Sequence, residues 1–145
     1  PLAVGALIAV SALGGCAGDT VTVTLPDGAQ RAACQALGPR WPDAVSGRPP
    51  TGMSVDSAAA RAYGAPAIIA ICGYPAPAPG LLECLDVDGV DWLVQRRSDG
   101  VQFTTYGRDP AMDVLVPAAY APEPLLLPAF SSAARSLPET GQRCR

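Results

Sequence analysis

Five short runs rich in apolar and β-branched residues fill the middle of the chain, and turn-forming residues separate them. The runs occupy residues 67–72, 81–87, 90–97, 101–106 and 112–116. Runs of this length and composition are typical of β-strands. The pair Asp88-Gly89 lies between the second and third runs and is typical of a type I′ hairpin turn, because both residues tolerate positive φ. The pattern predicts an antiparallel meander of four to five strands.

The segments on either side of these runs favour short helices. Residues 31–45 begin with helical spacing, residues 54–63 are Ala-rich enough for one or two turns, and residues 125–137 are amphipathic. Pro128 is compatible with the first turn of the last helix. Residues 19–28 alternate and suit a short extended segment or a tether. We therefore expect an α+β fold, with helices packed on one face of the sheet.

The beginning of the chain, residues 1–18, carries no charged side chain. A membrane-spanning helix needs about 20 predominantly apolar residues, and the strongly apolar part, residues 2–13, is shorter. Small residues follow it, as they follow the apolar region of a secretory signal peptide. Leu13-Gly14-Gly15-Cys16 also resembles the bacterial lipobox, in which the cysteine receives a diacylglycerol and becomes the first residue of the mature protein. An uncleaved helical anchor is the alternative.

This interpretation divides the chain into three parts. Residues 1–15 are expected to be a signal peptide, residues 16–30 a lipidated N-terminus and tether beginning at Cys16, and residues 31–145 one domain. The membrane, reached through the lipid, is then a partner. The expected location is the outer face of the cell membrane.

Composition excludes several classes of function. The chain has no His, which removes Ser-His-Asp and Cys-His nucleophiles and imidazole metal ligands. Its net charge of −3 lacks the basic footprint of a nucleic-acid binder, and its densest basic spot is only Arg96-Arg97. We expect no cofactor, no metal and no nucleic-acid partner.

Four cysteines remain when Cys16 is assigned to lipid: Cys34, Cys72, Cys84 and Cys144. An even number in an exported domain predicts two disulfides, with three possible connectivities; buried free thiols are the alternative. If the runs holding Cys72 and Cys84 are neighbouring antiparallel strands, these two cysteines pair. Cys34 would then pair with Cys144 and hold the tail of the chain.

Several short motifs, weak individually, occur in a specific order. They are Ala62-Tyr63-Gly64-Ala65-Pro66, Cys72-Gly73, Gly89-Val90-Asp91-Trp92, Phe103-Thr104-Thr105-x-Gly107-Arg108-x-Pro110 and Val114-x-Val116-Pro117. Together they resemble the actinobacterial domain of unknown function 3515 family over roughly residues 34–144. The resemblance implies export or membrane attachment and a cell-envelope role, and it implies no particular activity. Two positions depart from the pattern: Tyr63 stands where the family has Trp, and Ile71 where it has Arg.

Acidic residues offer two kinds of candidate chemistry. Asp86, Asp88 and Asp91 gather oxygen ligands as calcium sites do, but their order differs from an EF-hand loop and a hairpin turn needs no ion. We favour the turn. A carboxylate pair, Glu83 with Asp86 or Asp109 with Asp113, would suit a glycoside-hydrolase-like mechanism; any chain with 13 acidic residues contains such pairs.

Three other side chains are candidates for binding. Trp92 with Arg96 can form an exposed aromatic and cationic surface for a peptide or glycan, although alternation on the strand favours a core position for Trp92. Arg108 is a charged residue inside a family motif, and it either binds a ligand anion or locks the turn through a neighbouring acid.

The sequence thus favours an envelope lipoprotein that binds or scaffolds, with an envelope protein as its partner. An envelope hydrolase acting through a carboxylate pair and a small-ligand carrier are the alternatives. The hydrolase would place two carboxylates in one pocket, and the carrier would have an apolar cavity between sheet and helices.

Overall fold

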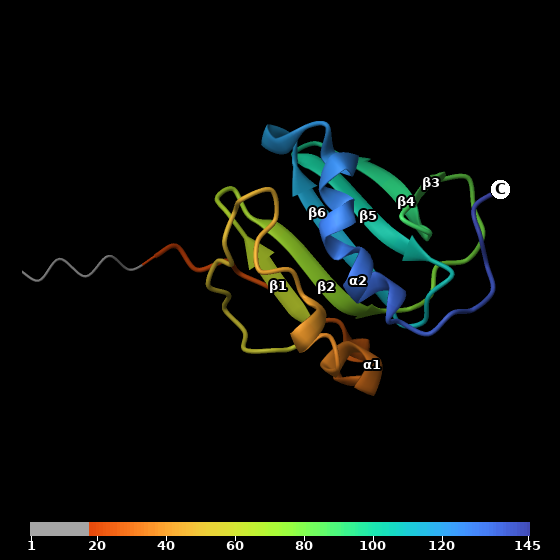
Figure 1. Ribbon diagram of the computed structural model, residues 1–145, viewed down its shortest axis with the longest axis horizontal. Coiled ribbons are helices and arrows are strands. Elements are labelled where there is room, and N and C mark those ends of the chain that lie inside the picture. Colours follow the sequence, from red (N-terminus) through yellow and green to blue (C-terminus); the bar gives the residue numbers. More distant parts are fainter. Residues whose placement is uncertain (1–17) are drawn as a thin grey trace, which may run out of the picture.

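The computed structural model describes residues 18–145, so the expected signal peptide and Cys16 lie outside the described residues. One antiparallel sheet of six strands forms the centre, with short helical segments packed against it (Figure 1). The strands are β1 (Ala60–Tyr63), β2 (Ile68–Tyr74), β3 (Glu83–Val87), β4 (Val90–Arg97), β5 (Gly100–Tyr106) and β6 (Ala111–Pro117). The helical segments are η1 (Asp27–Gln30), α1 (Ala32–Gln35), η2 (Gly38–Arg40), η3 (Ala118–Tyr120), η4 (Glu123–Phe130) and α2 (Ser131–Arg135).

The strand order is β1-β2-β6-β5-β4-β3. Strands β3 to β6 are the expected meander, and the hairpin of β1 and β2 is added beside β6. The five expected strands are therefore present, but β2 and β3 are not neighbours. Because three strands, β6, β5 and β4, lie between β2 and β3, the Pro-rich connection of residues 75–82 must cross the sheet.

The strand β1 replaces the helix expected at residues 54–63. Ala60 pairs with Ile71, and Tyr63 pairs with Ile68. An Ala-rich segment has little strand propensity of its own, but here pairing with β2 and complete burial of Tyr63 decide its conformation.

The helix expected at residues 125–137 is divided. Residues Glu123–Phe130 form the 3₁₀ segment η4, which contains Pro128, and the α-helix α2 begins only at Ser131. Proline has no backbone N–H to donate and restricts the residue before it. Pro128 therefore lies outside the α-helix instead of in its first turn.

The main core lies between one face of the sheet and the segments η4 and α2, which cross in front of β5 and β6 in Figure 1. Trp92, Phe103 and Phe130 are fully buried there. Tyr63 packs edge to face on Phe130, with ring centroids 6.0 Å apart. These side chains fill the space in which a small-ligand carrier would need its cavity.

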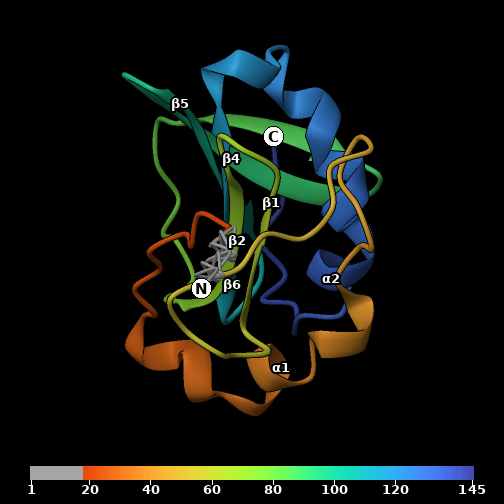
Figure 2. The same cartoon turned by 90° about the vertical axis from the view of Figure 1, so that its left-hand side faces the viewer.

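The segment before η1 packs against the opposite face of the sheet. Val21 forms a bridge with Met53, and Val23 is buried against Ile71 and Ala60. Figure 2 shows this segment beside β1 and β2, with η1 and α1 at the end of the sheet. The described part of the expected tether, residues 18–30, thus belongs to the folded body, because its alternating apolar residues cover an apolar patch of the sheet.

The Asp88-Gly89 hairpin has the expected geometry, since φ is 53° at Asp88 and 76° at Gly89. The backbone N–H of Gly89 also donates to Asp86 Oδ1 at 3.2 Å. Gly73 forms a bulge in β2, and its backbone lies against Gly28 of η1. A Cβ on Gly73 would lie 2.3 Å from the backbone nitrogen of Ala29, so only glycine permits this contact.

Candidate functional site

Two disulfides connect the four cysteines of the described domain, but the expected pairing is wrong. Cys34 bonds to Cys72 and Cys84 bonds to Cys144, with Cα separations of 5.5 and 5.6 Å. The prediction failed because it required β2 and β3 to be neighbours, whereas three strands separate them. Cys72 also lies on the face of β2 that packs on α1, and Cys84 lies on the opposite face of the sheet. The two bonds indicate an oxidising environment outside the cytoplasm. Among residues 18–145, no helix is long and apolar enough to cross a membrane.

The Cys84–Cys144 bond attaches the tail of the chain to the edge strand β3. Further upstream the tail is held by Arg108, which is buried and donates to the carbonyl oxygens of Arg135 at 3.2 Å and Leu137 at 2.8 Å. The Arg108 guanidinium also pairs with Glu139 at 3.0 Å. These contacts match the locking role considered for Arg108, although the acid comes from the tail and not from the adjacent turn.

Arg143 fixes the last part of the tail. Its Nε lies 2.9 Å from Asp91, a buried carboxylate, and its Nη2 lies 3.4 Å from Asp86. The backbone N–H of Cys144 donates to the same Asp91 carboxylate at 2.8 Å. A buried carboxylate requires partners of this kind, so Asp91 orders the tail.

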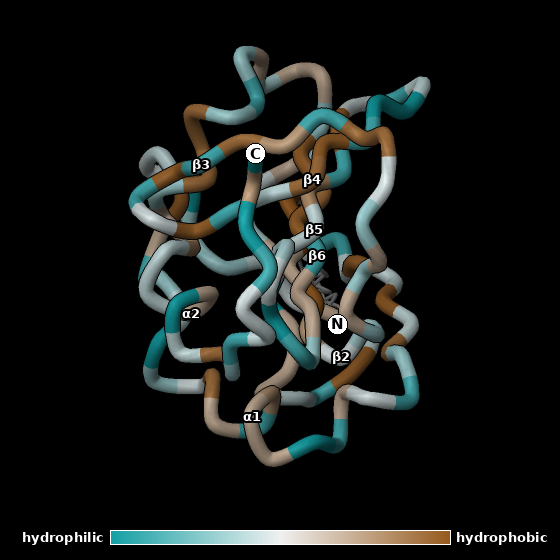
Figure 3. The backbone as a smooth tube through the Cα atoms, turned by 90° about the vertical axis from the view of Figure 1, so that its right-hand side faces the viewer, coloured by the Kyte–Doolittle hydropathy of each residue, from teal (hydrophilic) through white to brown (hydrophobic). Residues whose placement is uncertain are grey.

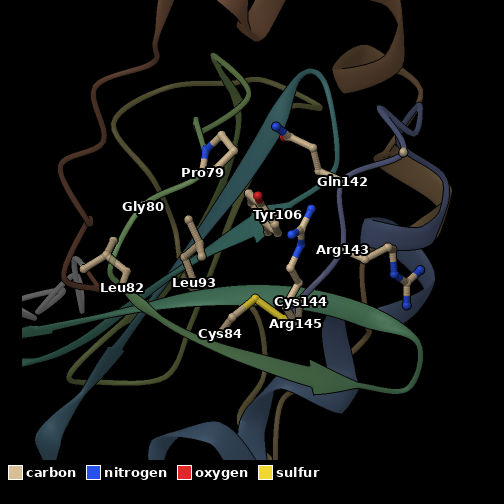
Figure 4. Close-up of a pocket in the computed structure, with 11 residues that line it drawn as sticks. Pro79, Gly80, Leu82, Cys84, Leu93, Tyr106, Gln142, Arg143, Cys144 and Arg145 are labelled. Atoms are coloured by element: carbon tan, nitrogen blue, oxygen red, sulfur yellow. A yellow bond between two sulfur atoms is a disulfide. The ribbon is translucent and has the colours of Figure 1, made fainter.

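Beside this tail lies a surface cleft of about 720 Å³, which we call the tail cleft. Figure 4 shows the Pro-rich loop on one side and the tail on the other, with the Cys84–Cys144 bond between them. Leu93 of β4 and Tyr106 of β5 form its floor, and the side chain of Arg145 extends towards Tyr106. The full lining is Pro79, Gly80, Leu82, Cys84, Leu93, Tyr106, Gly141, Gln142, Arg143, Cys144 and Arg145.

The hydropathy pattern along the backbone shows apolar residues at the start of β3 and polar residues along the tail (Figure 3). Leu81 is fully exposed and Leu82 is half exposed, both in the loop before β3. Exposed leucines beside a concave surface mark a candidate contact region.

The carboxylates proposed as catalytic pairs contact arginines or polar side chains instead of each other. Glu83 lies 3.7 Å from Arg96, and Asp86 lies near Arg143. Asp109 pairs with Arg31 at 2.6 Å on the outside of the domain.

Asp113, the partner proposed for Asp109, is instead buried on the sheet. It accepts hydrogen bonds from Gln102 Nε2 at 2.7 Å and Thr104 Oγ1 at 2.6 Å. Burial raises the pKa of Asp113, while these two hydrogen bonds and the charge of Arg97 act in the opposite direction. The network satisfies the carboxylate within the sheet and leaves it outside the tail cleft.

The acidic side chains at the hairpin are paired with other side chains of the same domain. Asp86 and Asp91 contact Arg143, and Asp88 Oδ2 accepts from Ser131 Oγ at 3.0 Å. Within residues 18–145, no group of three His, Cys, Asp or Glu residues is arranged to hold a metal ion.

Trp92 and Arg96 do not form a common surface. The Trp92 side chain is fully buried, and its Nε1 has no hydrogen-bond partner within the described part of the chain. Arg96 lies in solvent, with its side chain 76% exposed. Trp92 is therefore a core residue, as the alternation on its strand favoured.

A second open hollow, of about 790 Å³, lies beside η1 and the end of β2. Tyr74 lines it, and burial raises the pKa of the Tyr74 hydroxyl. The arginine of this hollow, Arg31, already pairs with Asp109, which is also in the lining. The tail cleft differs because no acidic side chain lines it.

Sequence reasoning missed the residues of the tail cleft. Leu93 and Tyr106 read as ordinary strand residues, and Arg143 and Arg145 as part of a polar tail. Their association depends on the Cys84–Cys144 bond, which no local pattern reveals. The available signal was the Leu81-Leu82 pair directly after a Pro-rich stretch.

The fold and the cleft define a class: a small disulfide-bonded α+β domain with a surface site between a Pro-rich loop and a covalently held tail. The family model described as "Protein of unknown function (DUF3515)" matches residues 2–140, so the chain belongs to this family. Neither the curated proteins nor the solved structures give a match.

Proposed function

We propose that this protein is a cell-envelope lipoprotein, anchored by Cys16 to the outer face of the membrane, whose domain serves as a binding or scaffolding accessory. The observation that carries the binding role is the tail cleft, a concave site lined by apolar and cationic side chains without a carboxylate. A hydrolase of the carboxylate-pair type needs two carboxyl side chains flanking the bond that breaks, and the lining of the tail cleft has no acidic side chain. The tail cleft offers a surface for recognition instead.

Two features support the anchor. The disulfides require an oxidising compartment, and the lipobox-like segment ends at Cys16, close to the first packed residues of the domain. Val21 already donates its backbone N–H to Gly52 at 2.8 Å. A link of five residues spans at most about 18 Å, so the anchor would hold the domain close to the membrane surface.

Detergent phase partition of the wild type and of Cys16→Ser tests the anchor. The wild type should enter the detergent phase and the variant should not, because a two-chain lipid supports stable membrane binding. Ala17→Ser is the matched control and should behave as the wild type. Equal partition of wild type and Cys16→Ser would contradict lipid attachment.

Site-specific photo-cross-linking in intact cells tests the binding role. A photoreactive residue at Leu81 or Leu82, on the rim of the tail cleft, should give one reproducible cross-linked envelope protein. The same residue at Arg40, an exposed position on η2, should not give it. Equal cross-linking from both positions, or none from the rim, would contradict a scaffolding role at this surface.

A further inference from the structure

We infer that the tail cleft binds an amphipathic organic anion, in which a carboxylate or phosphate group contacts Arg145 and Gln142 and an apolar body lies on Leu93 and Tyr106. This inference rests on the assignment of the tail cleft as the binding site, and it does not depend on lipid attachment at Cys16.

Charge favours an anion over other ligands. The protein has a net charge of −3, yet the lining of the tail cleft contains two arginines and no acidic residue. Arg143 is engaged by Asp86 and Asp91. Arg145 forms no ion pair within residues 18–145 and extends over the floor of the cleft (Figure 4). A guanidinium in this position matches the planar geometry of carboxylate and phosphate oxygens.

The floor and the loop side favour an apolar body for the same ligand. Leu93 is almost buried in the floor, Tyr106 presents an aromatic ring beside it, and Leu82 is half exposed above. Contact with a ligand would remove this apolar surface from water, which an inorganic anion cannot do. A volume of about 720 Å³ is within the range of small-molecule sites.

The polar and apolar parts of the tail cleft are joined by the Cys84–Cys144 bond. The bond holds Arg145 and Gln142 on one side of the floor and leaves the loop residues Pro79–Leu82 on the other. A ligand must therefore carry both kinds of group on one molecule to use the whole site. This requirement separates an amphipathic anion from a simple ion or a neutral hydrocarbon.

Calorimetric titration of the protein extracted from cells in a neutral detergent tests the inference, with hexyl phosphate and hexanoate as probes. Hexan-1-ol and inorganic phosphate supply the two halves separately. One or both amphipathic anions should bind, and each half should bind at least about tenfold more weakly, since each loses one set of contacts. Inorganic phosphate binding as tightly as hexyl phosphate would show an adventitious ion only and overturn the inference.

Two variants locate the site. Arg145→Gln should weaken binding of the amphipathic anion by about fivefold or more. Arg40→Gln, an equal change of charge elsewhere on the surface, should change it by less than about twofold. Equal effects of the two substitutions, or no binding by the wild type, would overturn the inference.

A final comparison distinguishes the source of the anion. Dihexanoyl phosphatidate, used below its micelle concentration, presents the same phosphate on a lipid. Tighter binding than hexyl phosphate indicates a lipid headgroup as the ligand, and weaker binding indicates a soluble one. If neither hexyl phosphate nor dihexanoyl phosphatidate binds, the inference of an anionic ligand is wrong. The partition and cross-linking tests of the proposed function are unaffected by that result.

Discussion

At the scale of single residues, the positions in the family motifs mostly serve backbone geometry and the ordering of the tail. Gly89 turns the β3–β4 hairpin, Gly73 lets η1 approach β2, and Arg108 holds the tail through two carbonyl oxygens and Glu139. Tyr63 is buried, its hydroxyl donates to the carbonyl of Pro42 at 2.8 Å, and burial raises its pKa to about 12. These residues have structural roles within the domain and do not imply a reaction.

Gly89→Val should lower the free energy of unfolding by about 1–2 kcal/mol, because a β-branched residue is strained at positive φ. A Cβ at this position meets no atom within 4 Å, so the cost is conformational and not steric overlap. Urea denaturation measures the change. Added calcium should leave the melting temperature of the wild type unchanged, and an increase of several degrees would restore the ion-binding interpretation of the hairpin.

Asp113 should give the domain a characteristic pH dependence. Its pKa in the folded state is raised above 3.8, so the folded state binds this proton more tightly than the unfolded state. The contribution of Asp113 to stability is therefore greatest below pH 3.8 and falls as the pH rises through its folded pKa.

Urea unfolding of the wild type and of Asp113→Asn, from below pH 3.8 to neutrality, tests this. The stability of the wild type relative to the variant should decrease over that window. Asp19→Asn, at an exposed carboxylate, controls for the change in net charge. A relative stability that increases with pH would contradict a raised pKa for Asp113.

At the scale of elements, the domain depends on close contacts between short segments more than on long helices. The segment η1 lies on the bulge of β2, next to the Cys34–Cys72 bond that connects α1 to the same strand. Local sequence identified β2 to β6 well, because their apolar runs and turns agree with the final pairing. It misassigned β1 as a helix and predicted one continuous helix where the structure has η4 and α2, since an Ala-rich stretch and a Pro-containing stretch acquire their conformations from tertiary neighbours.

Gly73→Ala should destabilise the domain by more than about 3 kcal/mol, because the new Cβ overlaps the backbone of Gly28 and Ala29 at a positive φ. Gly52→Ala is the matched control, since a Cβ there meets nothing within 4 Å. Thermal unfolding of both variants measures the difference. Equal melting temperatures would show that η1 does not approach the β2 bulge as described.

At the scale of the whole molecule, an exported domain of modest size holds its tail by a covalent bond to an edge strand. The sequence supported the α+β class, the family and the presence of two disulfides. It did not predict the tail cleft, because the cleft joins residues 79–82, Leu93 and Tyr106 to residues 141–145. Hydrophobic periodicity is local, whereas this association depends on strand order and on which face each cysteine occupies.

The Cys84–Cys144 bond holds the tail against β3 and so forms the tail cleft. Peptide mapping without reduction, after cleavage at the arginines and at Glu83, tests it directly, because the cut at Glu83 separates Cys72 from Cys84. Peptide 84–96 should carry residues 144–145, and peptide 32–40 should be linked to peptide 62–83. A linkage of peptide 32–40 to residues 144–145 would contradict it, since the tail would then lie against α1 and the tail cleft would not exist.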